Sequence, residues 1–227
     1  GQLRLNQGRP AEAGELLGAA WRGYQATLGA SGALTLTVGN NYAGTFMEQE
    51  LWGEAVEVLI EVVQGMRVAY EPDDPRIHLA LMNLGGCHSR RGESRLSLEV
   101  MKEAVDLAMG HLPKAHKRRV DASRVTGFQL VSMGRAKEAV PYYEQAMEEC
   151  EANGQVLPLA RSELRLGQAR CLHEAGLYQA AVEAFDTLLE IETARVGDPE
   201  STWLKELSAE AELSRQASAA QGGADVD

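Results

Sequence analysis

Small and large apolar residues recur along the chain with one fixed spacing, and this pattern predicts its architecture. A small residue stands at five positions that are each 42 residues apart: Ala13, Ala55, Ser97, Ala139 and Ala181. A large apolar residue follows each of them four positions later: Leu17, Leu59, Met101, Tyr143 and Phe185. Positions four apart lie on one face of a helix, so each copy predicts an amphipathic helix whose small residue lets a neighbouring helix approach closely.

A turn residue stands five positions before each of these small residues. It is glycine in four copies, Gly8, Gly92, Gly134 and Gly176, and Glu50 in the remaining copy. Glycine suits the left-handed conformation that ends many helices. A further column of small residues lies before the turn: Ala43, Gly85, Gly127 and Ala169. Each repeat therefore predicts a first helix, a tight turn and a second helix, and such pairs must stack to bury their apolar faces.

These columns predict the position of every helix. First helices are expected at about 34–48, 76–90, 117–132 and 158–174, and second helices at about 10–28, 52–69, 94–110, 136–152 and 178–195. Residues 1–217 are expected to form one array. It comprises a half unit over 1–33, units over about 34–75, 76–116, 117–157 and 158–199, and a terminal helix over 201–217. Residues 218–227 are small and acidic and predict a disordered tail.

Three segments carry a resemblance to a known repeat type: Asn40-Asn41-Tyr42-Ala43, Met82-Asn83-Leu84-Gly85 and the linker Tyr70-Glu71-Pro72-Asp73-Asp74-Pro75. Together with the period they resemble tetratricopeptide repeats of the kinesin light chain type. The resemblance implies an all-α fold, a right-handed α-solenoid of antiparallel helix pairs. The Asn of the first-helix motif becomes Val125 and then Gly167, and the stretch near Pro113 differs from the linker, so the chain is a divergent example.

Composition and charge limit the functions that this fold would carry. The net charge of −11 disfavours nucleic-acid binding, which needs positive charge against phosphates. No apolar run is long enough for a membrane span. The three cysteines, Cys87, Cys150 and Cys171, form no metal or redox motif. An intracellular, cytoplasmic location is therefore expected, with an organelle or a cilium left open.

The resemblance implies that the first helices line a concave, peptide-binding face. The residues placed there from successive repeats are Asn40, Asn41, Met82, Asn83, Arg90, Arg124, Phe128 and Arg170. An Asn amide can donate and accept hydrogen bonds at once, so Asn41 and Asn83 are predicted to hold the backbone of an extended ligand. The alternative is that both amides are exposed without a ligand.

The three arginines on this face allow two interpretations. Arginine forks bind carboxylates, so Arg90, Arg124 and Arg170 would favour a peptide with acidic residues, beside apolar contacts to Met82 and Phe128. Alternatively they pair with acidic residues of the first helices: Glu48, Glu163 and Glu174. The carboxylate clamp that some tetratricopeptide proteins use is not expected here, because Asp121 and Val125 occupy its positions.

Other candidate sites are weaker. The basic run Lys114-Ala115-His116-Lys117-Arg118-Arg119 predicts either an acidic partner or a solvated helix start. His111, His116 and His173 lack the close spacing of metal ligands. No phosphate loop or nucleophile motif is present in the sequence. We therefore expect no cofactor, no metal and no enzymatic activity.

The resulting hypothesis is a protein-interaction scaffold or adaptor that binds a peptide or a helix of a partner in its concave groove. The alternative is a constitutive subunit or assembly factor of a large multiprotein complex, in which the outer faces are buried as well. An RNA-binding helical repeat fits the acidic charge and the 42-residue period poorly.

Overall fold

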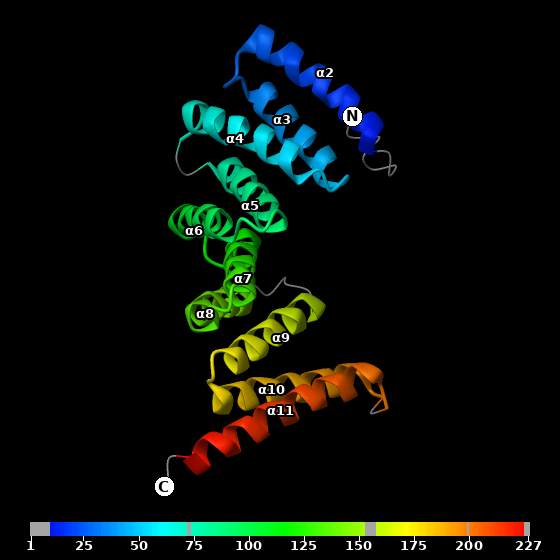
Figure 1. Cartoon of the computed structure of the whole chain (residues 1–227), viewed down its shortest axis with the longest axis vertical. Helices are drawn as coiled ribbons and strands as arrows, with labels where there is room; N and C mark the ends of the chain where they lie inside the picture. Colours follow the sequence, from blue (N-terminus) through cyan, green and yellow to red (C-terminus); the bar gives the residue numbers. More distant parts are fainter. Residues whose placement is uncertain (1–9, 72–73, 153–157, 199, 225–227) are drawn as a thin grey trace. The chain divides into compact units, whose positions relative to one another are not determined.

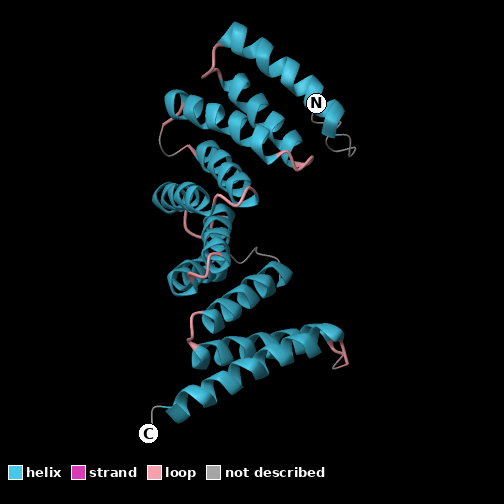
Figure 2. Cartoon of the chain, viewed as in Figure 1, coloured by secondary structure: helices cyan, strands magenta, loops and turns pink. Residues whose placement is uncertain are grey.

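The computed structural model of the protein describes residues 10–71, 74–152, 158–198 and 200–224. Within these ranges the chain forms helices and turns, and no described residue lies in a strand (Figure 2). The helices, labelled in Figure 1, are α2 (Pro10–Leu28), α3 (Ala33–Met47), α4 (Trp52–Ala69), α5 (Pro75–Arg90), α6 (Ser94–His111), α7 (Lys117–Ser132), α8 (Ala136–Ala152), α9 (Pro158–Glu174), α10 (Tyr178–Val196) and α11 (Thr202–Ala224).

Within α2 to α6 and within α7 to α11, helices that are adjacent in sequence pack against each other, as expected for pairs joined by short turns. The chain divides into two compact units, Gly1–Pro113 (unit 1) and Lys114–Asp227 (unit 2). Within unit 1 the first helices are α3 and α5, and within unit 2 they are α7, α9 and α11. The boundary falls at the stretch near Pro113, where the sequence departs from the repeat linker. The predicted all-α fold of antiparallel helix pairs is confirmed in each unit.

The turn column ends the first helices in the predicted way. Gly92, Gly134 and Gly176 have positive φ of 76°, 69° and 75°, and Glu50, the one non-glycine, has φ of 59°. The same backbone bond closes each turn, from the N–H after the turn residue to a carbonyl five residues earlier. Its donors and acceptors are Leu51 to Phe46, Glu93 to His88, Arg135 to Leu130 and Leu177 to Leu172, at 2.9–3.0 Å. This is the Schellman cap, which satisfies carbonyls at the helix end. Gly8 lies outside the described residues.

The column of small residues is buried throughout the array. Ala13, Ala55, Ser97, Ala139 and Ala181 are all 0% exposed. Ser97 keeps its hydroxyl satisfied by donating to the Gly85 carbonyl at 2.8 Å. The prediction that these positions allow close helix approach is therefore confirmed.

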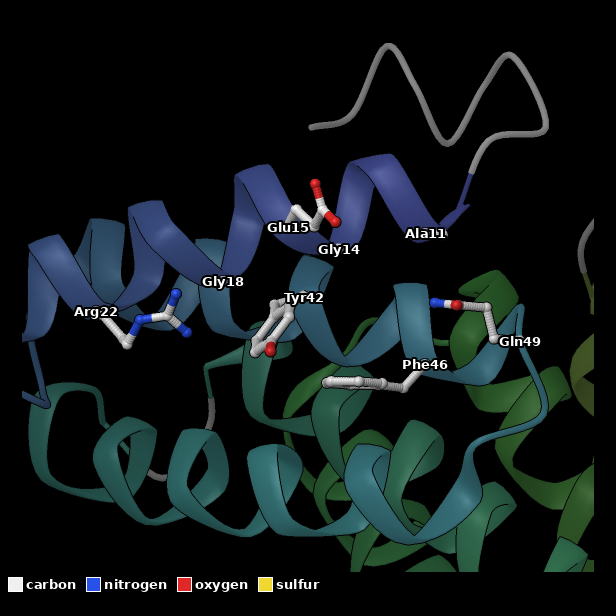
Figure 3. Close-up of a pocket in the computed structure, with 8 residues that line it drawn as sticks. All are labelled: Ala11, Gly14, Glu15, Gly18, Arg22, Tyr42, Phe46 and Gln49. Atoms are coloured by element: carbon white, nitrogen blue, oxygen red, sulfur yellow. The ribbon is translucent and has the colours of Figure 1, made fainter.

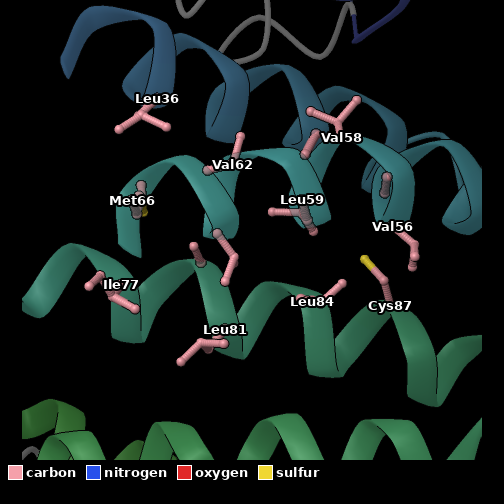
Figure 4. Packing of buried hydrophobic residues seen from close by; sticks show 14 of the residues in the cluster. Leu36, Val56, Val58, Leu59, Val62, Met66, Ile77, Leu81, Leu84 and Cys87 are labelled. Carbon is pink, nitrogen blue, oxygen red and sulfur yellow. The ribbon is translucent and has the colours of Figure 1, made fainter. Parts of the chain in front are cut away.

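The core of unit 1 is aliphatic. Between α3, α4 and α5 it contains Leu36, Leu59, Val62, Ile77 and Leu81, each at most 2% exposed (Figure 4). Gly65 of α4 allows Leu36 of α3 to pack closely, because a Cβ at this position would lie 2.6 Å from a Leu36 methyl. Unit 1 is thus held together mainly by burial of branched apolar side chains.

Unit 2 adds buried carboxylates to a smaller apolar cluster. Glu192 of α10 is 0% exposed and accepts hydrogen bonds from Ser162 of α9 at 2.5 Å and from the Trp203 indole of α11 at 3.0 Å. Arg195 also pairs with it at 2.5 Å. Glu149 of α8 accepts from the Ala115 backbone N–H at 2.6 Å and pairs with Arg119 of α7. Glu192 thus connects α10 to α9 and α11, and Glu149 connects α8 to the start of α7.

The C-terminal region differs from its predicted form. Helix α11 continues to Ala224, whereas the sequence predicted a helix ending at 217 and a disordered tail over 218–227. The extension is attached to α10, because Arg215 pairs with Asp186 and the Ser218 hydroxyl donates to Gln179 at 3.4 Å. Composition alone suggested disorder, but the helix continues, and its contact with α10 reaches Ser218, the first residue of the extension. Residues 225–227 lie outside the described part.

Candidate functional site

In unit 1 the amides of the first helices meet across α3 and α5. The Asn83 side chain donates to the Asn40 side-chain oxygen at 3.3 Å. Asn83 is therefore hydrogen-bonded within the chain, to the residue next to Asn41. Asn41 is half-buried and forms no side-chain hydrogen bond with any described residue. Met82 is also half-buried and packs against the core, which leaves only part of it for a ligand. The structure therefore places Asn40, Asn41 and Asn83 close together, with Asn41 open to a further hydrogen bond.

Arg90 lies near an aromatic ring that the sequence did not single out. Its guanidinium carbon is 5.5 Å from the centroid of the Trp52 ring of α4, and its side chain is exposed. Such cation–π contacts hold an arginine in place without neutralising its charge. Within the described residues Arg90 has no acidic partner, so its charge remains open to one.

In unit 2 an exposed aromatic residue stands on the first-helix face. Phe128 of α7 is 62% exposed, and Arg124, one turn earlier, is exposed too. Below this face lies Tyr143 of α8, which is 4% exposed. A Cβ on Gly127 of α7 would lie 2.9 Å from its ring, and one on Gly167 of α9 would lie 2.8 Å from it. Both helices therefore approach the ring closely at a glycine. Burial raises the pKa of Tyr143 to about 12, and the nearby charges of Arg124 and Arg170 act in the opposite direction.

Arg170 is paired, though not with an acidic residue that the sequence suggested. Its guanidinium binds both carboxylate oxygens of Glu210 in α11, at 2.7 and 2.6 Å. The hydrogen bond to Glu210 raises the pKa of Arg170 above its ordinary value. The interpretation in which these arginines pair internally therefore holds for Arg170, but its partner is Glu210 and not Glu48, Glu163 or Glu174.

A pocket of about 370 Å³ opens beside this ion pair. Its lining comes from α7, α9, α10 and α11: Val131, Arg170, His173, Glu174, Phe185, Glu210 and Leu213. Leu213 is 59% exposed, and the His173 ring is held by the Ser214 hydroxyl at 2.9 Å. The sequence did not place residues of α11 at this site, because it predicted only a terminal helix over 201–217 without a role in binding. The apolar residues of α11 predicted an amphipathic helix, but they did not indicate that Leu213 would remain exposed.

The other candidate residues have structural roles. Lys117 pairs with Asp121 at 2.9 Å and Arg119 pairs with buried Glu149, so part of the basic run stabilises the start of α7. Burial raises the pKa of both the Cys87 and Cys171 thiols to about 11, which keeps them protonated and weak as nucleophiles. The described residues contain no cluster of three or more potential metal ligands. No described helix combines the length and apolarity that crossing a bilayer requires.

Comparisons with known proteins were made with the sequence and with the structure. No family model matches the sequence, and no curated protein matches it significantly. The structure is similar to that of a kinesin light chain protein of Podosopora anserina with nearly identical TPR-like repeats. Their TM-score is 0.75 at 20% identity, over 86% of this chain and 92% of that one.

Two further structures extend the comparison. BtubC (BKLC) of P. vanneervenii has a TM-score of 0.74 at 16% identity, over 87% of this chain and 78% of that one. YrrB, described as a TPR protein with an unusual peptide-binding site, has a TM-score of 0.51 at 16% identity, over 82% and 91%. These likenesses agree with the helix pairs, the Schellman turns and the buried small-residue column. The chain has the fold of the tetratricopeptide-type repeat proteins, in the form seen in kinesin-light-chain-like repeats.

Proposed function

We propose that the chain is a protein-interaction scaffold or adaptor that binds a peptide or a helix of a partner on the face of its first helices. The observation that carries the proposal is Phe128. It is a 62% exposed aromatic side chain on a first helix, beside exposed Arg124. Phenylalanine and arginine are both enriched at protein–protein interfaces relative to the rest of the surface, so this pair is typical of a binding surface.

The polar groups of unit 1 support the same proposal. Asn41 has an unused amide, and Asn83 lies against Asn40, so one extended backbone is able to contact neighbouring amides. Arg90 has a free charge for a carboxylate of the ligand. Within each unit the first-helix face thus offers hydrogen bonds, charge and apolar area together.

The similar structures support a binding role in general terms. YrrB is described as having a peptide-binding site, and it shares the fold of this chain. The shared fold does not transfer a ligand, so the chemistry of the partner is inferred from this chain alone. That chemistry is a segment with acidic and apolar side chains.

The test is to select peptides from a random displayed library against the intact chain and measure their affinity for variants. The double change Asn41→Ala and Asn83→Ala should weaken a peptide bound on unit 1 by about thirtyfold or more, because each lost amide costs about 1–2 kcal/mol. Phe128→Ala should weaken one bound on unit 2 to a similar degree, and Arg124→Glu should harm acidic peptides more than neutral ones.

The matched control is Leu96→Ala, which removes a 42% exposed apolar side chain from the second helix α6. Unchanged affinity in this control, with losses in the first-helix variants, supports the proposal. Losses confined to second-helix variants would contradict it.

A second candidate function is a constitutive subunit of a large complex. It is favoured by apolar exposure on α2 and α3, where Leu16 is 55%, Leu28 is 50% and Leu34 is 53% exposed. Larger exposed apolar areas commonly mark permanent interfaces. Changing these leucines to Ser should improve the solubility of the isolated chain if they belong to such an interface, and should leave peptide affinity unchanged.

A further inference from the structure

A second pocket, of about 340 Å³, lies in unit 1 between α2 and α3 (Figure 3). The residues that shape it are Gly14, Gly18, Arg22, Tyr42, Phe46 and Gln49. Of these residues, Tyr42 and Phe46 lie on the side of α3 that faces α2, whereas Asn40 on the same helix meets Asn83 of α5. The pocket is therefore separate from the first-helix face to which the proposed function is assigned.

Two glycines in the middle of α2 line this pocket and let side chains of α3 approach the α2 backbone closely. A Cβ on Gly18 would lie 2.9 Å from the Tyr42 ring, and one on Gly14 would lie 3.1 Å from the Thr45 hydroxyl. At the equivalent positions of the next repeat, 42 residues later, stand Val56 and Ile60. Val56 is 4% exposed and packs into the core. Ile60 is 39% exposed. In α2 the glycines instead make room for α3, because the Tyr42 ring and the Thr45 hydroxyl take the space of the missing side chains. Glycine inside a helix costs about 0.5–1 kcal/mol relative to alanine.

The floor of the pocket is aromatic and held rigidly. The centroids of the Tyr42 and Phe46 rings are 4.8 Å apart, with an angle of 55° between the ring planes. The centroid of the Trp21 ring lies 5.6 Å from that of Tyr42. Both Tyr42 and Phe46 remain partly exposed. Tilted rings at these distances present edges and faces to a third ring, which is the preferred aromatic geometry.

A positive charge without a partner stands at one end of this floor. Arg22 is exposed and forms no ion pair with any described residue. In Figure 3 its guanidinium extends toward Tyr42, while the Glu15 carboxylate on the same helix points away from the two rings. A carboxylate brought to this end would meet an arginine that is free to form a bidentate pair.

We propose that this pocket docks a peptide segment of another protein in which an aromatic residue is followed closely by an acidic one. The aromatic side chain packs on the exposed parts of the Tyr42 and Phe46 rings, and the carboxylate pairs with Arg22. A volume of about 340 Å³ is enough to hold one such side chain. The scaffold would then carry two binding surfaces in unit 1, on different sides of α3.

The experiment titrates the whole isotope-labelled chain with the acetylated peptide Ala-Ala-Phe-Glu-Glu-Ala and follows NMR shifts. The reporters are the backbone amides of Gly18, Tyr42 and Phe46 and the indole N–H of Trp21. Shifts at these groups are expected, and they should vanish when the Phe of the peptide is replaced by Ala. Replacing both Glu by Gln in the peptide should weaken binding by about fivefold, which is the effect of one exposed ion pair.

Two variants test the pocket itself. Arg22→Gln should weaken binding by about fivefold, whereas the control Arg95→Gln, which removes an exposed arginine of α6, should change nothing. Ala11→Leu places a bulky side chain at the pocket edge and should abolish the shifts without altering the unfolding midpoint. The variant Phe128→Ala should bind normally, so a failure here is distinct from a failure of the first-helix face.

Three outcomes would overturn the proposal. Arg22→Gln with unchanged affinity would remove its electrostatic part. Peptide shifts confined to α7 or α9 would assign the peptide to the other face. Shifts at Tyr42 and Phe46 that appear on raising the protein concentration without peptide would assign the pocket to a second copy of the chain.

Discussion

In unit 1, α3, α4 and α5 are joined by aliphatic side chains, whereas in unit 2, α9, α10 and α11 meet at a buried carboxylate. Leu59 and Val62 are at most 1% exposed in the first region. Glu192 is 0% exposed in the second and has donors on its own helix and on both neighbours. The repeat plan is the same, because small residues and turns match in both units.

The stability of unit 1 therefore depends on how well apolar side chains fill its core, whereas that of unit 2 depends also on a buried charge and its hydrogen bonds. Apolar burial is non-directional, so unit 1 should lose stability in proportion to the volume removed. A buried carboxylate must keep its donors, so unit 2 should respond to single polar changes and to pH.

The largest effect is expected from Leu59→Ala in unit 1. The side chain is fully buried between helices, and its removal leaves a cavity that costs about 2–5 kcal/mol. Urea unfolding measures the loss, and hydrogen exchange should locate it in α3 to α5. Faster exchange in α9 to α11 instead would show that the two units do not respond separately.

Glu192→Ala should produce a loss of about 2–4 kcal/mol in unit 2. The change leaves the Ser162 hydroxyl and the Trp203 indole without their acceptor, and buried unpaired donors cost about 1–3 kcal/mol each. Faster hydrogen exchange in α9 to α11 is the readout. The control is Glu190→Ala, an exposed carboxylate of the same helix, which should leave exchange unchanged.

Ala139→Leu tests what the two units share. The residue is 0% exposed, so the larger side chain should overpack α8 against its neighbours and cost about 1–3 kcal/mol. Ala55→Leu in unit 1 should cost about as much, since it stands in the same column. An unchanged urea midpoint in either variant would contradict the shared role of the column.

Acid should weaken unit 2 through Glu192. The hydrogen bond from Arg195, together with those from Ser162 and Trp203, lowers the pKa of Glu192 to about 2, against about 4.3 when unfolded. Because the folded pKa is the lower one, this contribution is present above about pH 4.3 and is lost as the pH falls toward 2. The difference in urea midpoint between the wild type and Glu192→Gln should therefore shrink between pH 5 and pH 2.5. A difference that stays constant over this range would mean that folding does not change the pKa of Glu192.

The smallest effect is expected from Arg67→Ala in unit 1. Arg67 pairs with Glu103 at 2.7 Å, but the two side chains are 51% and 41% exposed. Exposed ion pairs contribute about 0–1 kcal/mol, so the urea midpoint should hardly move. A loss as large as that of Glu192→Ala would remove the distinction between surface and buried charges.

The helices, their ends and the buried column were predictable from the sequence, because each depends on neighbours within one or two turns. Ala13 and its equivalents were recognised by their periodic spacing, and Gly92, Gly134 and Gly176 by the conformation that a helix end requires. The predicted helix at 52–69 agrees with α4 (Trp52–Ala69). The end of α11 was not predicted, because the small, acidic composition of these residues does not reveal that Ser218 contacts Gln179 of α10.

The partners of the site residues were decided only by the tertiary structure. Asn83 meets Asn40 at a separation of 43 residues, Arg170 meets Glu210 at 40, and His173 meets Ser214 at 41. These separations scatter around the 42-residue period, because neighbouring helices are offset and each side chain selects its own rotamer. The open pocket at Gly14 and Gly18 likewise depends on where Tyr42 lies in three dimensions. The periodic sequence determines which helices form and which faces they bury, while the packing of one helix on the next selects the side chains that meet.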